Sequence, residues 1–177
     1  MFDRKTLDEL YDYTACTWAM IAEVCAALPE GTLAKPAPGS GWPALRDAFQ
    51  HVLGAIDGWL HETLDYGPLI NPPPGALDTW EGIARYREQV RATFRRVLDE
   101  TPDDQLFEPF TRTYDEDGPE TMSLADILAN LLLHERGHHG DFTTLFWQLG
   151  VDQPALDYRQ YVYLKHHPDS PYRPPGW

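Results

Sequence analysis

Four segments of the 177-residue sequence carry apolar side chains at the spacing of an α-helix, and this pattern constrains the fold more than any other feature. A helix with one apolar face must bury that face against another element. The predicted helices cover about residues 6–28, 43–65, 79–100 and 124–149. Four long amphipathic segments joined by two longer connections predict an all-α four-helix bundle with long crossover connections.

The connections carry turn and capping signals. The segment 71–75, Asn-Pro-Pro-Pro-Gly, predicts a stiff, extended linker that crosses between helices. Alternating residues from Phe107 to Met122 predict a short, exposed β-hairpin before the last helix. Ser123 and Asp126 have the spacing of a capping box that begins this helix, and Gly150 is expected to end it.

A chain of this length is expected to form one domain over residues 1–177, because it can bury a sizeable core on its own. Its composition, with 42% hydrophobic and 24% charged residues, is typical of a globular protein. The Tyr- and Pro-rich tail, about residues 151–177, is expected to wrap the bundle as an irregular strap.

The charge balance argues against binding to nucleic acids or to anionic membrane surfaces. Fourteen basic and 28 acidic residues give a formal net charge of -14, so the average surface field repels phosphate groups. Five arginines share the third predicted helix with acidic residues, and we interpret them as a solvated face. They are Arg85, Arg87, Arg91, Arg95 and Arg96.

The sequence is expected to be that of a cytoplasmic protein. Its first residues lack the apolar stretch of a secretion signal, and no uncharged stretch approaches the roughly 20 residues that a membrane helix requires. Cys16 and Cys25 are nine residues apart on a predicted helix, which places them on opposite faces, so they cannot pair with each other. Free thiols are typical of a reducing compartment, and both are interpreted as small core residues.

The last predicted helix contains two histidines four residues apart, His134 and His138. They are about 40° apart around the helix and beside its apolar stripe, so both imidazoles are expected to face the core. Two imidazoles one turn apart can bind the same metal ion. Two buried histidines with hydrogen-bonded partners are the alternative, because such a pair also arises by chance.

A third histidine, His51, belongs to the second predicted helix. Its neighbours on the same strip of that helix are small: Ala44, Ala48, Ala55 and Gly58. Small residues let a facing helix approach closely, and an imidazole among them is placed to reach across the bundle as a ligand. A histidine at the rim is the alternative.

The segment His-Glu-Arg-Gly-His also matches a zinc-protease pattern in which Glu135 would be the general base. We discount this class, because no later glutamate can complete a thermolysin-like site and Asp141 stands where the metzincin extension requires glycine. The remaining histidines are interpreted as a surface residue at a helix end, His61, and as tail residues, His166 and His167.

With these residues, the sequence resembles the DinB/YfiT-like family of small bacterial four-helix metalloproteins. The segment 41–47, with Trp42, is similar to the family's start of the second helix, and His51 to its first ligand. The segment 134–158 is similar to its fourth helix and the residues that follow. The family usually has His-Arg-Gly-Gln at the end of this motif, whereas this chain has His-His-Gly-Asp at 138–141, which replaces a cation and an amide near the site.

The resemblance implies that His51, His134 and His138 bind one divalent ion, most often zinc or nickel, with its other coordination positions open to water or substrate. Open positions are typical of catalytic metal sites. Three polar residues within one turn of a ligand on the same helix are candidates to orient the imidazoles. They are Asp47, Asn130 and Asp141.

Two functions from different classes follow. The first is a metal-dependent transferase or hydrolase that acts on a small molecule, and relatives imply a thiol S-transferase that uses a low-molecular-weight thiol. The second is a stress-linked binding or scaffold module in which the ion is mainly structural. The resemblance also implies a homodimer, for which Trp59, Trp80 and Phe94 are candidate contacts; packing in the core is the alternative for all three.

Overall fold

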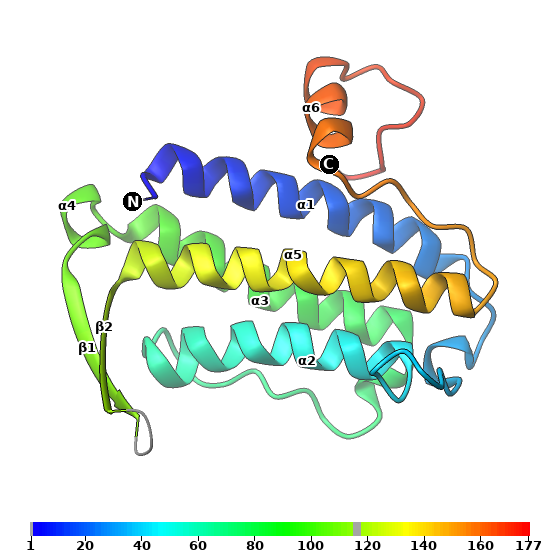
Figure 1. Cartoon of the computed structure of the whole chain (residues 1–177), viewed down its shortest axis with the longest axis horizontal. Coiled ribbons are helices and arrows are strands. Elements are labelled where there is room, and N and C mark those ends of the chain that lie inside the picture. Colours follow the sequence, from blue (N-terminus) through cyan, green and yellow to red (C-terminus); the bar gives the residue numbers. More distant parts are fainter. Residues whose placement is uncertain (1, 115–117) are drawn as a thin grey trace.

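A computed structural model describes residues 2–114 and 118–177. The fold is all-α, as predicted: four long helices form a bundle, with a two-stranded sheet at one end (Figure 1). The bundle helices are α1 (Arg4–Ala26), α2 (Leu45–Gly58), α3 (Trp80–Glu100) and α5 (Leu124–Gln148). The shorter elements are η1 (Thr32–Ala34), η2 (Trp59–Thr63), η3 (Ala76–Asp78), α4 (Asp103–Leu106), β1 (Pro109–Tyr114), β2 (Gly118–Ser123) and α6 (Tyr158–His166). None of the described helices is both long enough and apolar enough to cross a membrane.

The order of the helices confirms the predicted crossover. Helices α1 and α5 run in one direction, and α2 and α3 run in the other (Figure 1). Because α2 and α3 are parallel, the chain between them must return along the length of the bundle. Residues 64–79, which contain the three consecutive prolines, make this return.

The helix ends agree with the capping signals except in α2. Thr79 caps α3 by accepting a hydrogen bond from the backbone N–H of Gly82 at 3.2 Å. Ser123 and Asp126 form the predicted capping box of α5. The α-helical part of α2 ends at Gly58, and the next turn, η2, is a π-helix. The predicted helix over 43–65 was therefore too long at its beginning, and its last turn has a different helical geometry.

Strands β1 and β2 form the predicted hairpin. They pair antiparallel, with Pro109 opposite Ser123 and Tyr114 opposite Gly118. The predicted turn residues 115–117 lie outside the described residues.

The tail differs from the irregular strap that was predicted, because it contains helix α6. Asp157 caps this helix by accepting a hydrogen bond from the backbone N–H of Gln160 at 3.0 Å. Tyr161 and Leu164, three residues apart, are both buried, which gives the helix one inward face. The nine residues are too few to show the repeated apolar spacing of a longer helix, which is why the sequence did not predict this one.

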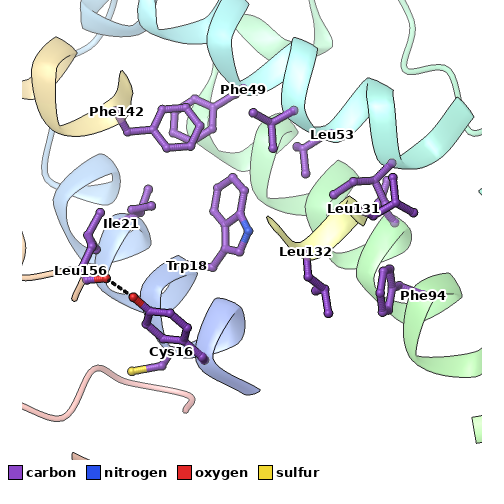
Figure 2. Packing of buried hydrophobic residues seen from close by; sticks show 14 of the residues in the cluster. Cys16, Trp18, Ile21, Phe49, Leu53, Phe94, Leu131, Leu132, Phe142 and Leu156 are labelled. Atoms are coloured by element: carbon purple, nitrogen blue, oxygen red, sulfur yellow. Dashed lines mark hydrogen bonds between the residues drawn. The ribbon is translucent and has the colours of Figure 1, made fainter. Parts of the chain in front are cut away.

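The buried side chains of the bundle meet around Trp18 of α1, which is fully buried (Figure 2). Phe49 of α2 stacks on Phe142 of α5 with 4.4 Å between ring centroids, and this contact joins the two helices that carry the histidines. Phe94, a candidate dimer contact, is 3% exposed and belongs to this core, so that prediction is wrong for Phe94. Trp59 is partly buried and packs against the same core.

Candidate metal site

The structure brings His51 of α2 together with His134 and His138 of α5. The ring centroids are 4.5 Å apart for His134 and His138, 4.8 Å for His51 and His138, and 5.4 Å for His51 and His134. One nitrogen from each ring lies within 4.8 Å of the other two. Three nitrogens bound to one ion at about 2.0–2.1 Å lie about 3.3–3.6 Å apart, so the rings would rotate toward one another to complete the set.

Small residues allow α2 and α5 to approach at this point. Ala44 and Ala48, on the strip of α2 that carries His51, are both buried. The stacked pair Phe49 and Phe142 fixes the same two helices against each other. His51 itself is exposed, whereas His134 and His138 are half-buried, so the cluster lies at the surface end of the helix interface.

The electrostatics around His51 and His134 favour neutral imidazoles. Burial lowers the pKa of His134, and the nearby His138 and His51 lower it further. Burial and His138 likewise lower the pKa of His51, against a smaller opposing effect of Asp141. Neutral imidazole is the form that binds a metal ion. His134 Nε2 is also buried without a hydrogen-bond partner among the described residues, as is His139 Nε2 in the core, so no protein group competes for the His134 nitrogen. The donor set therefore fits a divalent ion.

Of the three residues proposed to orient the histidines, Asp141 contacts one of them. Its Oδ2 accepts hydrogen bonds from His138 Nδ1 at 2.7 Å and from Trp42 Nε1 at 2.9 Å. Asp47 instead lies 3.8 Å from the Arg46 guanidinium, and Asn130 is exposed. Among the described residues, neither Asp47 nor Asn130 has a hydrogen bond to the three histidines.

Glu135 and His139 point away from the cluster. Both are 1% exposed, and Arg91 of α3 forms an ion pair with Glu135 at 3.3 Å. Burial nevertheless raises the pKa of Glu135, because loss of hydration outweighs the attraction of the nearby guanidinium groups. Glu135 is therefore not placed to act as a base at the histidines, in agreement with the argument against a zinc protease. The departure from the family motif at His139 also lies in the core rather than near the site, and only the departure at Asp141 reaches it.

The arginines of α3 do not all form the solvated face that was predicted. Arg91 also donates to the backbone carbonyl of Tyr11 on α1 at 3.0 Å, and its side chain is 11% exposed. Burial lowers the pKa of Arg87, and its guanidinium lies 5.8 Å from the centre of the Trp18 ring. These two arginines point inward because they have partners there: Arg91 contacts the Tyr11 carbonyl of α1 and the Glu135 carboxylate of α5, and Arg87 lies near the Trp18 ring of α1. Arg85 and Arg96 are exposed, as predicted.

His61, predicted to be on the surface, is 7% exposed and hydrogen-bonded through Nδ1 to Asp57 at 2.6 Å. Asp57 is also buried and accepts from the Tyr86 hydroxyl at 2.8 Å. It further accepts from the backbone N–H groups of Ile70 and Asn71, which fixes the middle of the crossover. The four-residue spacing of Asp57 and His61 could have indicated this pair in the sequence, but nothing in the sequence indicated that the predicted crossover is bound to Asp57.

The two cysteines are free and buried, as predicted. Burial raises the pKa of Cys16 to about 12 and raises that of Cys25 as well. At neutral pH neither thiol supplies a thiolate, which is the nucleophilic form.

The fold and the cluster define a class of protein: a four-helix bundle with three histidines gathered from two of its helices. The model of the DinB family matches residues 1–171, so the chain belongs to the DinB family. No curated protein and no solved structure matches the chain.

Proposed function

We propose that His51, His134 and His138 bind one divalent ion, zinc or nickel, and that the protein is a metal-dependent enzyme acting on a small molecule. The observation that carries this proposal is the convergence of three imidazole nitrogens within 4.8 Å from two different helices. Three neutral nitrogen ligands on an exposed site leave coordination positions for water or substrate, as in catalytic zinc sites.

The reaction we propose is the transfer or hydrolysis of a small substrate by a nucleophile held at this site. A divalent ion bound there can lower the pKa of a water or thiol ligand toward neutrality. The chain's own thiols, Cys16 and Cys25, are buried in α1, which supports a nucleophile that comes from solution. A low-molecular-weight thiol is therefore the first substrate to test.

A binding or scaffold module with a mainly structural ion is the second candidate. Glu135 favours it, because the carboxylate between the two histidines of α5 is paired with Arg91 and faces the core. Asp141, which does reach the cluster, is already bonded to His138 and Trp42. An enzyme of this kind would depend on the ion itself for most of its chemistry.

The metal content of purified variants tests the binding site. We expect about one ion per chain in the wild type. Zinc binding should weaken by more than about 100-fold in each of the variants His51→Ala, His134→Ala and His138→Ala. The reason is that removing a residue that only orients a ligand already weakens metal binding about 10–100-fold. His166→Ala, in the exposed end of α6, is the matched control and should retain the ion. Full occupancy in His51→Ala would show that the ion does not bridge α2 and α5.

Activity separates the enzyme from the structural module. The zinc, nickel and manganese forms are assayed with bacillithiol, mycothiol and glutathione against monochlorobimane, beside His138→Ala. The proposal expects turnover that requires both the metal and His138. Equal rates with and without metal would assign the turnover to background chemistry, and no turnover with any thiol would favour hydrolysis or the structural ion.

Three further expectations complete this proposal. A cytoplasmic location and the absence of nucleic-acid binding are supported by the free thiols and by the net charge of -14. A homodimer is supported by the family resemblance. With Phe94 in the core, the exposed Leu133 and Trp147 of α5 are better placed as dimer contacts than Phe94.

A further inference from the structure

One oxygen atom of Asp141 links α5 to the loop before α2. Asp141 Oδ2 lies 2.7 Å from His138 Nδ1 and 2.9 Å from Trp42 Nε1. Asp141 and His138 are three residues apart on the same helix, whereas Trp42 comes from a segment 99 residues away in the sequence. The carboxylate therefore touches both a histidine of the cluster and the loop that faces it.

The loop is built to hold Trp42 at this place. Gly39 and Gly41 have φ angles of 81° and 84°, a left-handed conformation that favours glycine, and they flank Ser40. Ser40 Oγ accepts from the backbone N–H of Trp42 at 3.1 Å, and its hydroxyl lies 2.7 Å from the carbonyl of Ala37. These bonds make a tight turn from which the indole projects toward the histidines.

The Trp42 ring forms a wall of the cluster. Its centroid lies 5.0 Å from that of His51 and 5.5 Å from that of His138. The indole N–H has one proton to donate, and Asp141 accepts it. Asp141 consequently fixes the position of the wall as well as that of one histidine.

We propose that Asp141 is the positioning residue of this site: it holds His138 with its proton on Nδ1, so that Nε2 is the ligand atom, and it holds Trp42 against the cluster. The reason is which atoms can donate a hydrogen bond. An ionised carboxylate only accepts hydrogen bonds, so His138 Nδ1 must donate, and a neutral imidazole that donates from Nδ1 has its lone pair on Nε2. Carboxylates that accept from a ligating histidine fix its orientation and raise its basicity. The inference rests on the proposed metal site but concerns a residue outside the ligand set.

Asp47 supplies a control for the charge of Asp141. It is a half-buried aspartate one turn before His51 on α2, and its recorded partner is the Arg46 guanidinium at 3.8 Å. Asp47→Asn and Asp141→Asn remove the same charge near the cluster, but only Asp141 contacts a histidine of the cluster among the described residues. A difference between the two variants therefore reports the direct contact of Asp141 with the cluster, through its hydrogen bond and its nearby charge, and the tautomer measurement below isolates the hydrogen bond.

The first measurement is the zinc dissociation constant by competition with a chromophoric chelator. We expect Asp141→Ala to weaken zinc binding about 10–100-fold, the usual cost of losing the partner of a ligating histidine. Asp141→Asn should fall between Asp141→Ala and the wild type. Asp47→Asn should change the constant by less than about threefold, as expected for a partly exposed charge without a hydrogen bond to the three histidines among the described residues. Trp42→Phe keeps a ring but removes the N–H, and it should weaken binding less than Asp141→Ala.

The second measurement needs no metal. Two-bond proton–nitrogen NMR of the metal-free, ¹⁵N-histidine-labelled protein reports which nitrogen of His138 carries the proton. The wild type, Asp47→Asn and Trp42→Phe should show the Nδ1–H form, and Asp141→Ala should lose this preference. Far-ultraviolet circular dichroism and the thermal midpoint in EDTA verify that each variant is folded.

The outcomes separate this inference from the proposed function. A wild type that binds no zinc at micromolar concentrations overturns the metal site, while the NMR experiment still decides whether Asp141 sets the His138 tautomer. Tight zinc binding by the wild type, with Asp141→Ala no weaker than Asp47→Asn, overturns the role of Asp141 and leaves the metal site intact. An Nε2–H or evenly mixed His138 in the wild type overturns it as well.

Discussion

Helix α5 carries two polar pairs with the same four-residue spacing, offset by one residue, and their surroundings differ completely. His134 and His138 lie toward α2 and are half-buried. Glu135 and His139 are 1% exposed and lie toward α1 and α3. A step of about 100° around one helix therefore separates a candidate ligand site from a buried structural cluster.

The neighbouring helices make this difference. Toward α2, the small side chains of Ala44 and Ala48 leave room between the helices. Toward α3, Arg91 supplies a guanidinium that compensates a buried carboxylate, and on α1 the fully buried Trp18 packs edge-on against His139. The spacing in α5 fixes which side chains share a side, and the residues of the other helices decide what each pair can do.

The two adjacent histidines are also held with opposite tautomers. His138 Nδ1 faces the Asp141 carboxylate and must donate to it when the ring is neutral. His139 Nδ1 faces the Arg136 guanidinium, which can only donate, so the proton of the neutral ring is on Nε2, which has no hydrogen-bond partner among the described residues. A protonated His139 would lose this bond, which agrees with its low pKa. The comparison thus predicts a ring at His138 that can bind a metal ion through Nε2, beside a ring at His139 that is held neutral.

The largest effect is expected from Glu135→Ala. Removing one partner of a buried ion pair leaves Arg91 uncompensated and should lower the free energy of unfolding by about 3–5 kcal/mol. Glu88→Ala, an exposed glutamate on α3, is the matched control and should change it by less than about 0.5 kcal/mol. Urea unfolding in EDTA measures both, and zinc titration of the folded variant should still give one site. A loss below about 1 kcal/mol, or loss of the zinc site, would contradict the separation of the two pairs.

The second prediction concerns pH. Burial, followed by the charges of Arg136, Arg91 and His138, lowers the pKa of His139 well below 6.5. Near pH 6.5 the unfolded chain binds a proton at His139 that the folded chain does not bind. The contribution of neutral His139 to the free energy of unfolding is therefore complete above pH 6.5 and is lost as the pH falls below it. In EDTA, His139 should contribute a decline of up to about 1.4 kcal/mol per pH unit between pH 6.5 and 5.

His139→Gln isolates this contribution. The variant should unfold with a flatter dependence on pH over that interval, whatever its stability at neutral pH, whereas His166→Gln in the exposed tail should keep the wild-type slope. Glu135 changes the pH dependence of stability in the opposite direction. Its pKa is raised in the folded state, so its contribution to the free energy of unfolding is lost as the pH rises from 4.5 toward the folded pKa. Its effect is largely common to the wild type and His139→Gln, so the difference between their curves reports His139. Identical slopes would show that His139 is not held neutral.

The sequence predicted the elements of the bundle from apolar periodicity, and it indicated the three histidines from their helix positions together with the family resemblance. Apolar spacing and the caps at Thr79 and Ser123 mark the helices, and the small residues around His51 mark the side on which α5 approaches. The remaining features depend on contacts between distant segments. The pairing of Asp141 with Trp42 spans 99 residues, and that of Arg91 with Glu135 spans 44. No pattern within one helix distinguishes Asp141 from Asp47, or Arg91 from the exposed Arg85.

The smallest effect is expected from Gly137→Ala, which changes the outer face of α5 between the two polar pairs. Gly137 is exposed, and an added Cβ would meet no atom within 4 Å, so the methyl group fits without displacing either pair. Alanine loses less conformational freedom than glycine on entering a helix, and the free energy of unfolding should rise by about 0.5–1 kcal/mol. Zinc affinity should stay within about twofold of the wild type, because neither pair is touched.

Gly82→Ala is the contrasting variant, since a Cβ there would collide with the backbone of Ala76 and should destabilise the protein. Urea unfolding and chelator competition on the two variants measure these effects. If Gly137→Ala weakened zinc binding tenfold, the histidines would depend on backbone flexibility of α5, and the two pairs could not be treated as independent.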